Sequence, residues 1–148
     1  MPDNGTVTDA RIRASFARQG LMRTLGAALG RIAPGEVEIV LTPKPEISQQ
    51  HGFVHAGAVS AIADSAAGYA ALSLMPQGAG VLTVEFKISL LAPAQGERIT
   101  ARGRVVRQGR TLSFAQTEVF ARTGGEERLI ASLSATMMAI TDRAGIEG

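Results

Sequence analysis

The sequence contains no cysteine, so it cannot form disulfide bonds, use a catalytic thiolate or bind a metal through sulfur. Histidine is scarce as well. The only two, His51 and His55, are too few to build a zinc site without cysteine. We therefore expect a protein that works without a bound metal or organic cofactor.

An excess of either charge is also missing, because 15 basic and 13 acidic residues give a net charge of +2. A nucleic-acid-binding protein normally presents a dense basic face, so we expect no nucleic-acid partner. The N-terminus lacks an apolar segment behind a basic start, as its first residues MPDNGTVTDARIRAS show. It does not read as a secretory signal, and we expect a cytoplasmic location.

Repeats, low-complexity tracts and linkers are absent, and 148 residues suffice for one domain with a sizeable core. Residues 1–30 are expected to form a helical extension of this domain. Within it, Thr8 to about Gly26 predicts an amphipathic helix with Thr8 or Asp9 as its N-cap. The apolar residues that would face inward are Ile12, Phe16, Met22 and Leu25.

Period-two alternation predicts a short half-buried strand over residues 36–41, after breaks at Gly30 and Pro34-Gly35. Four further strand-like runs occur later in the chain, at 81–91, 97–107, 111–122 and 128–140. Turn residues separate these runs at 93–96, Gln108-Gly109 and Gly124-Gly125. The pair Gln108-Gly109 fits a two-residue hairpin.

Residues 56–75 are rich in alanine, lack proline and contain a single charged residue, Asp64. Alanine favours a helix, and because apolar residues lie all round the helical wheel, we expect the helix to be buried all round. A membrane span is the alternative, but Asp64, three serines and the lack of flanking Lys or Arg oppose it. The order of elements predicts an α+β fold, in which a five- or six-stranded antiparallel sheet curls round one long central helix.

Asp64 is the main candidate for chemistry. Its neighbours on the same face of the helix are all small, namely Gly57, Ser60, Ala61, Ala67, Gly68 and Ala71. An ionised carboxylate in apolar surroundings is unfavourable unless it is paired or solvated. Asp64 therefore either bonds to a loop or an arginine of the sheet, or lies at the floor of a cleft that the small side chains leave open.

The loop 49–57, before this helix, is the second candidate. The first N–H groups of a helix have no partner within the helix and carry the positive end of its dipole, so they suit a developing oxyanion. His55 could take part in that site or simply cap the helix. Nine residues separate His55 from Asp64, about 13.5 Å of helix at 1.5 Å per residue. One carbonyl group cannot contact both ends within one chain, so a site that uses both requires a second subunit.

The pattern His55-Ala56-Gly57-x6-Asp64, on a long buried helix followed by four strands, resembles the hotdog-fold thioesterases and among them the PaaI-type branch. That branch shows His-Gly-Gly and then Asp or Glu nine residues after the histidine. The similarity continues through 83–88, 93–96 and 108–110, and it covers residues 34–140. It implies hydrolysis of acyl-CoA thioesters by a homodimer or homotetramer.

The resemblance also implies roles for single residues. Asp64 would act as general base, or as a nucleophile that forms a mixed anhydride, and Thr83 would help to position water beside it. The N–H of Ala56 would polarise the thioester carbonyl. Because Ala56 replaces a glycine of the family, Gly57 is the alternative donor.

The remaining roles concern the loop and the substrate. Gln49 would help to bind the carbonyl or water, and His55 would orient the loop or contact the thioester. The residues expected to contact the substrate are Phe53, Gly68, Arg104, Arg107 and Arg110, the arginines through the phosphates of CoA. Exposed arginines on strands also occur simply as a solvated face.

Two other functions remain open for such a fold: a hydratase or dehydratase acting on acyl thioesters, and a non-catalytic acyl-CoA sensor. The hydratase pattern, an aspartate followed closely by a histidine, does not occur in this sequence. A sensor would be expected to lack the helix carboxylate or to carry a DNA-binding extension, whereas this sequence keeps Asp64. Acyl-CoA hydrolysis is therefore the leading hypothesis.

Overall fold

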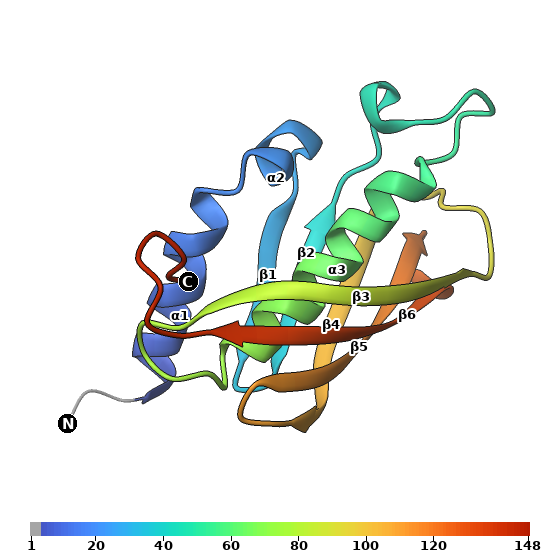
Figure 1. Ribbon diagram of the computed structural model, residues 1–148. Helices are drawn as coiled ribbons and strands as arrows, with labels where there is room; N and C mark the ends of the chain where they lie inside the picture. The colour runs from blue at the N-terminus through green and yellow to red at the C-terminus, as the bar shows by residue number, and fades with distance from the viewer. Residues whose placement is uncertain (1–3) are drawn as a thin grey trace.

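A six-stranded antiparallel sheet curls around helix α3 (Ala56–Leu72) in the computed structural model, which describes residues 4–148 (Figure 1). The strand order is β1-β2-β4-β5-β6-β3. The strands are β1 (Ala28–Ala33), β2 (Glu36–Leu41), β3 (Gly80–Leu90), β4 (Arg98–Gln108), β5 (Leu112–Thr123) and β6 (Glu126–Ile140). The predicted α+β architecture with a long central helix is confirmed.

Five of the six strands coincide with predicted runs. β2 has the predicted bounds, and β3 to β6 begin and end within two residues of the predictions. β1 was not predicted; it replaces the break expected at Gly30 and pairs with β2 across the turn at Pro34-Gly35. Its register shifts between Leu29 and Ile32, so its apolar residues do not alternate regularly and leave no period-two signal.

The two hairpins of the C-terminal half differ in their turns. The turn predicted at Gly124-Gly125 is confirmed; it has two residues, and both glycines have the positive φ that a type I′ turn requires. The two-residue hairpin predicted at Gln108-Gly109 is wrong, because Gln108 still belongs to β4 and residues 109–111 join the strands. The Gln108 side chain donates a hydrogen bond to the carbonyl of Leu74 at 2.6 Å, which ties this end of β4 to the segment after α3.

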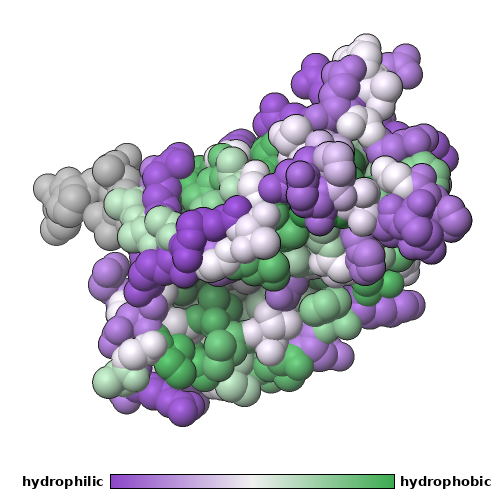
Figure 2. Space-filling view, turned by 90° about the horizontal axis from the view of Figure 1, so that it is seen from above, coloured by the Kyte–Doolittle hydropathy of each residue, from purple (hydrophilic) through white to green (hydrophobic). Residues whose placement is uncertain are grey.

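Strand β3 lies at one edge of the sheet. It pairs with β6 only, and its other edge has no strand partner in the part of the chain that the structure describes. Leu82, Val84 and Phe86 on this strand are 48%, 52% and 44% exposed. Apolar surface between hydrophilic residues is also visible from above in Figure 2. The strand therefore combines an open edge with apolar side chains.

The single helix predicted over Thr8–Gly26 is wrong, since two helices occur here: α1 (Asn4–Ala17) and α2 (Gly20–Leu25). Gln19 between them has an extended backbone, and its side chain is hydrogen-bonded to two residues of α3. Thr8 and Asp9 lie inside α1 and not at its N-cap. The inward-facing residues Ile12, Met22 and Leu25 are buried as expected, and Phe16 packs against the core.

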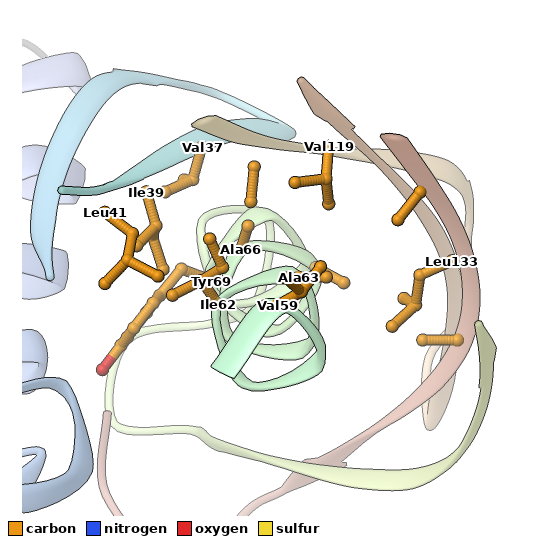
Figure 3. Close-up of a cluster of buried hydrophobic side chains, with 14 of the residues drawn as sticks. Val37, Ile39, Leu41, Val59, Ile62, Ala63, Ala66, Tyr69, Val119 and Leu133 are labelled. Carbon is orange, nitrogen blue, oxygen red and sulfur yellow. The ribbon is translucent and has the colours of Figure 1, made fainter. Parts of the chain in front are cut away.

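Small residues allow α3 to lie directly on the concave face of the sheet. Gly103 of β4 faces the backbone of α3, and a Cβ placed on it would collide with Ala66 and lie 2.8 Å from the nitrogen of Ala67. The fully buried Thr117 of β5 donates a hydrogen bond to the carbonyl of Ala63 at 2.9 Å. Side chains that the sheet directs toward the helix in Figure 3 include Val37, Ile39, Val119 and Leu133.

Burial changes along α3. Every residue from Ala66 to Leu72 is buried, as predicted. In the first half of the helix the prediction of burial all round is wrong, because Ser60, Asp64 and Ser65 are only half-buried. In the described part of the chain, no helix is long and apolar enough to cross a membrane. The open face of α3 carries its only charged residue.

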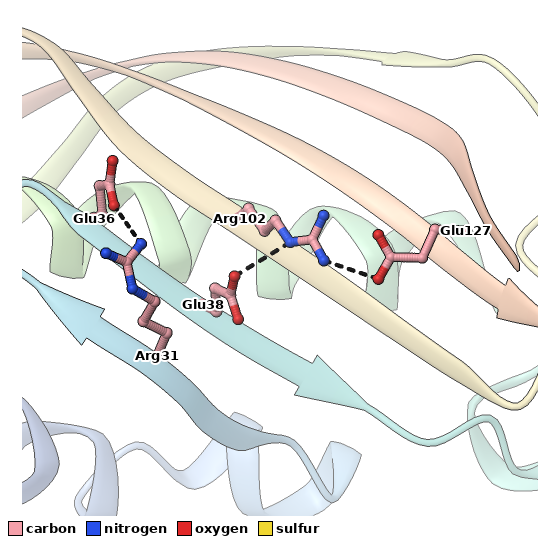
Figure 4. Close-up of polar contacts among 5 residues, drawn as sticks. All are labelled: Arg31, Glu36, Glu38, Arg102 and Glu127. Atoms are coloured by element: carbon pink, nitrogen blue, oxygen red, sulfur yellow. Dashed lines mark hydrogen bonds and ion pairs between the residues drawn. The ribbon is translucent and has the colours of Figure 1, made fainter. Parts of the chain in front are cut away.

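The face of the sheet turned away from α3 carries ion pairs (Figure 4). They are Arg31–Glu36 at 2.6 Å, Arg102–Glu38 at 3.2 Å and Arg102–Glu127 at 2.8 Å. The guanidinium of Arg102 also lies 4.6 Å from the centre of the Phe120 ring. Exposed pairs of this kind contribute at most about 1 kcal/mol each, so the apolar contact with α3 provides most of the stability of the sheet.

We expect Gly103→Ala to lower the free energy of unfolding by about 1–3 kcal/mol, because overpacking a tight contact forces backbone shifts of that size. Chemical denaturation measures the change. Gly20→Ala is the matched control, since a Cβ there meets only the Arg23 side chain at 3.6 Å and alanine favours a helix. Equal stability of the two variants would contradict the close contact between α3 and β4.

Candidate active site

Asp64 of α3 and Thr83 of β3 meet at the open face of the helix. The Thr83 hydroxyl donates a hydrogen bond to Asp64 Oδ1 at 2.7 Å. Val84 is an extra residue in β3, because the register with β6 shifts between Thr83 and Glu85. Thr83 thereby pairs with the fully buried Met137, and its hydroxyl points to the helix side of the sheet.

The surroundings of Asp64 affect its protonation in two ways. Burial raises the pKa of the Asp64 carboxyl, and the hydrogen bond from Thr83 partly opposes that rise. Within the described residues no ion pair reaches Asp64, so the pairing with an arginine of the sheet that the sequence left open is not found. The carboxyl is held by a neutral hydroxyl alone.

A hollow of about 570 Å³ opens beside Asp64. Four segments wall it: α1, α3, the first residues of β3 and the C-terminal residues 145–148. Gly68, one of the expected substrate contacts, lines this hollow together with Asp64 and Thr83. The contributions of α1 and of residues 145–148 were not predicted, because only the tertiary fold brings these segments to Asp64 and no local motif marks them.

At the other end of the open face, His55 is the N-cap of α3. Its Nδ1 accepts a hydrogen bond from the N–H of Gly57 at 2.7 Å, so the ring proton resides on Nε2. The N–H of Gly57 is thus occupied, whereas that of Ala56 has no acceptor among the described residues. Capping was one of the two roles that the sequence left open for His55.

Ala56, at the position where the resemblance would place a glycine, fits the backbone here without strain. In the described part of the chain, Asp142 is the only residue other than glycine with a positive φ. Ala56 therefore needs no backbone conformation that is reserved for glycine. Its N–H stays available at the first turn of the helix.

A second, mainly apolar hollow of about 470 Å³ lies at this end of α3. Gln49, Phe53, His55 and Ala56 all line it, opposite residues 90–94. The side-chain oxygen of Gln49 accepts a hydrogen bond from the N–H of His51, and its backbone N–H donates to the carbonyl of Phe53 at 2.8 Å. These bonds hold the loop in a tight turn beside the helix N-terminus.

The arginines expected to meet CoA lie in neither hollow. Arg104 donates a hydrogen bond to the side chain of Gln116 at 2.6 Å. Arg107 and Arg110 are exposed at the end of β4 and in the following turn. Within one chain, these side chains do not line the same hollow as Asp64 or Ala56.

Seven of the predicted site residues fall into two groups, and Gly57 and the three arginines line neither hollow. Asp64, Thr83 and Gly68 line one hollow, whereas Gln49, Phe53, His55 and Ala56 line the other, and the two hollows share no lining residue. The described residues contain no cluster of three His, Asp or Glu side chains that could hold a metal ion.

Comparisons with known proteins agree with this architecture. The family model described as the thioesterase superfamily matches residues 51–127, slightly more than half of the chain. Acyl-coenzyme A thioesterase 13 of Homo sapiens is 28% identical over 117 residues, which cover 78% of this chain and 83% of that protein.

Two solved structures show the same fold. A thioesterase family protein from Silicibacter pomeroyi is 51% identical, with a TM-score of 0.89 over 90% of this chain and 98% of that one. The E. coli PaaI protein from the phenylacetic acid degradation operon is 19% identical, with a TM-score of 0.84 over 93% of this chain and 96% of that one. On the strength of the matched family segment and the similarity to the Silicibacter protein, this hotdog-fold chain belongs to the thioesterase superfamily.

Proposed function

We propose that this thioesterase hydrolyses acyl-CoA esters to a free acid and CoA, with Asp64 as the carboxylate that acts on the thioester. The observation that carries the proposal is the setting of Asp64, which is half-buried, bonded to Thr83 and open to a hollow of about 570 Å³. A pKa raised by burial strengthens a carboxylate as a base. The name of the human relative, acyl-coenzyme A thioesterase 13, supports CoA as the thiol.

As a general base, ionised Asp64 takes a proton from water while the water oxygen attacks the thioester carbonyl carbon. The tetrahedral intermediate bears a negative charge on the carbonyl oxygen, which a helix N-terminal N–H stabilises. Collapse breaks the carbon–sulfur bond, and the CoA thiolate takes the proton back from Asp64. As a nucleophile, Asp64 would instead attack the carbonyl, expel CoA and leave a mixed anhydride for water to hydrolyse. Thr83 orients the carboxylate in both forms.

The proposed oxyanion donor is the N–H of Ala56 in a second copy of the chain. Within one chain, about 13.5 Å of helix separates Asp64 from this end of α3, and the two line different hollows. The open edge of β3 supports a second copy at this place, because an unpaired strand with apolar side chains is normally covered. β3 also carries Thr83, so a copy seated there lies beside Asp64. We expect a homodimer, or a homotetramer of two such dimers.

The loop and the arginines complete the proposed site. Gln49 and Phe53 line the hollow next to Ala56, which supports contacts of Gln49 with the carbonyl or water and of Phe53 with the substrate. His55 keeps the loop in place as the helix cap. For Arg104, Arg107 and Arg110, a contact with the CoA phosphates depends on how the second copy is seated.

Asp64→Asn should lower the turnover of acyl-CoA by at least about two orders of magnitude, because a general base typically raises the reaction rate by about 10²- to 10⁴-fold. Release of the CoA thiol measures turnover. Asp142→Asn, the same change at an exposed residue, is the control and should keep wild-type activity. Full activity of Asp64→Asn would refute the assignment, and binding of acyl-CoA without any turnover by the wild type would indicate a sensor.

A site shared between two copies can be tested by mixing two inactive variants. Ala56→Pro removes the N–H at the first helical position, where proline fits, and Asp64→Asn removes the carboxylate. In a mixed dimer one site keeps both groups, so equimolar co-refolding should restore roughly a quarter of the wild-type activity, given random pairing. Each variant refolded alone is the control. No gain on mixing would mean that both groups act within one chain or that Ala56 takes no part.

Thr83→Val should shift the acidic limb of the pH–rate profile to higher pH. The hydrogen bond from Thr83 lowers the pKa of Asp64, so its loss raises that pKa further, and the ionised carboxylate is the active form. The profile of kcat/KM between about pH 4 and 9 measures the shift. Thr111→Val, in the exposed turn after β4, should leave the limb in place. A downward shift in Thr83→Val would count against Asp64 as the titrating group.

A further inference from the structure

A chain of hydrogen bonds joins α1 to α3 in the wall of the hollow beside Asp64. The Tyr69 hydroxyl accepts a hydrogen bond from Gln19 Nε2 at 3.0 Å and lies 3.2 Å from Ser15 Oγ. Gln19 Oε1 in turn accepts a hydrogen bond from the Ser65 hydroxyl at 3.2 Å. Figure 3 shows the Tyr69 hydroxyl directed away from the sheet core, toward the N-terminal helices. We refer to Ser15, Gln19, Ser65 and Tyr69 as the polar network.

All four residues of the polar network line the same hollow as Asp64. Ser65 is the next residue after Asp64 in α3, and Tyr69, which is only 4% exposed, lies about one turn further along. The bonds within the network leave the second N–H of Gln19 and lone pairs of the serine hydroxyls for another partner. One more polar atom that enters the hollow can therefore join the network.

The hollow at the other end of α3 has a different character. Side chains such as Val59, Leu90 and Ile130 make it mainly apolar. A polar atom at the end of a bound acyl group that lies against these apolar side chains would lose its hydrogen bonds to water without gaining new ones. Its polar groups, Gln49, His55 and the N–H of Ala56, belong to the loop and the helix N-terminus, whereas the hollow beside Asp64 holds a connected set of side-chain partners.

The hollow beside Asp64 is also large enough to hold an acyl group. Its volume of about 570 Å³ lies within the range of about 300 to 1,000 Å³ found for small-molecule sites. Arg18, the residue after α1, donates a hydrogen bond to the carbonyl of Glu147 at 3.2 Å, and Gly148 N–H donates to the carbonyl of Ala79 at 3.1 Å. These contacts hold the C-terminal residues against α1 and the start of β3.

We propose that the hollow beside Asp64 is the acyl subsite, and that the polar network selects acyl groups carrying a hydroxyl or carbonyl oxygen at the end remote from the thioester. This rests on the proposed function, because it takes Asp64 as the group that acts on the thioester. Two members of the network, Ser15 and Gln19, lie outside the segment that the family model matches, residues 51–127. The selectivity is thus carried in part by the N-terminal helix of this chain.

Matched pairs of substrates test the proposal: hexanoyl-CoA against 6-hydroxyhexanoyl-CoA, and octanoyl-CoA against 8-hydroxyoctanoyl-CoA. For at least one pair, the kcat/KM of the wild type should be about tenfold higher for the hydroxylated ester. This is the difference expected from one additional hydrogen bond. Tyr69→Phe and Gln19→Met should abolish this preference by slowing only the hydroxylated ester. Gln77→Met, the same change at an exposed position, should retain it.

The alternatives give different results. Equal turnover of both members of each pair by the wild type would overturn the proposal while leaving acyl-CoA hydrolysis intact. A similar rise in KM for both esters in the two variants would mean that the network holds the pantetheine arm or only the fold, and would overturn it as well. Absence of hydrolysis with every ester would refute the proposed function itself, and the acyl subsite with it.

Discussion

The close approach of α3 to the sheet is the contact on which the rest of the molecule depends. Glycine at position 103 lets the helix backbone lie against β4, and the alanines of α3 keep the helix narrow enough to fit inside the curled sheet. Such a thin interface leaves no room for an ion pair between helix and sheet. Charged side chains of the strands gather on the outer face, as Arg102 does with Glu38 and Glu127, and Asp64 is left with a hydroxyl as its neighbour.

Much of the fold and of the candidate site could be predicted from the sequence, because the strongest signals lie within short segments of the chain. The buried helix follows from its alanine content, and β2 follows from strict alternation. Asp64 stands out as the only charge on that helix, among small neighbours. The place of Thr83 beside Asp64 could be anticipated only through a resemblance to a known family, because no local pattern distinguishes it from other threonines.

What could not be predicted depends on contacts between distant parts of the chain. The break between α1 and α2 occurs where Gln19 reaches Tyr69 and Ser65, about fifty residues later. β1 could not be predicted, because its irregular register with β2 removes the alternation of apolar and polar residues. The walls of the hollow beside Asp64 come from both ends of the chain and share no motif. Propensity and periodicity predict single helices and strands, whereas the helix break, β1 and the walls of the hollow depend on contacts between two or more elements.

The extra residue in β3 has a consequence for how the strand can change. Side chains of a regular strand alternate, so Thr83 and Ile88, five positions apart, would normally point to opposite sides. Because Val84 is an extra residue, the alternation of side chains starts again after it. The Thr83 hydroxyl and the apolar Ile88 therefore both face the helix, whereas Glu85 accepts a hydrogen bond from Thr136 on the outer side of the sheet. Loss of a single residue at this point would rotate half of the strand and exchange its inner and outer side chains. The length of β3 around Val84 is therefore as much a part of the site as the identity of its residues.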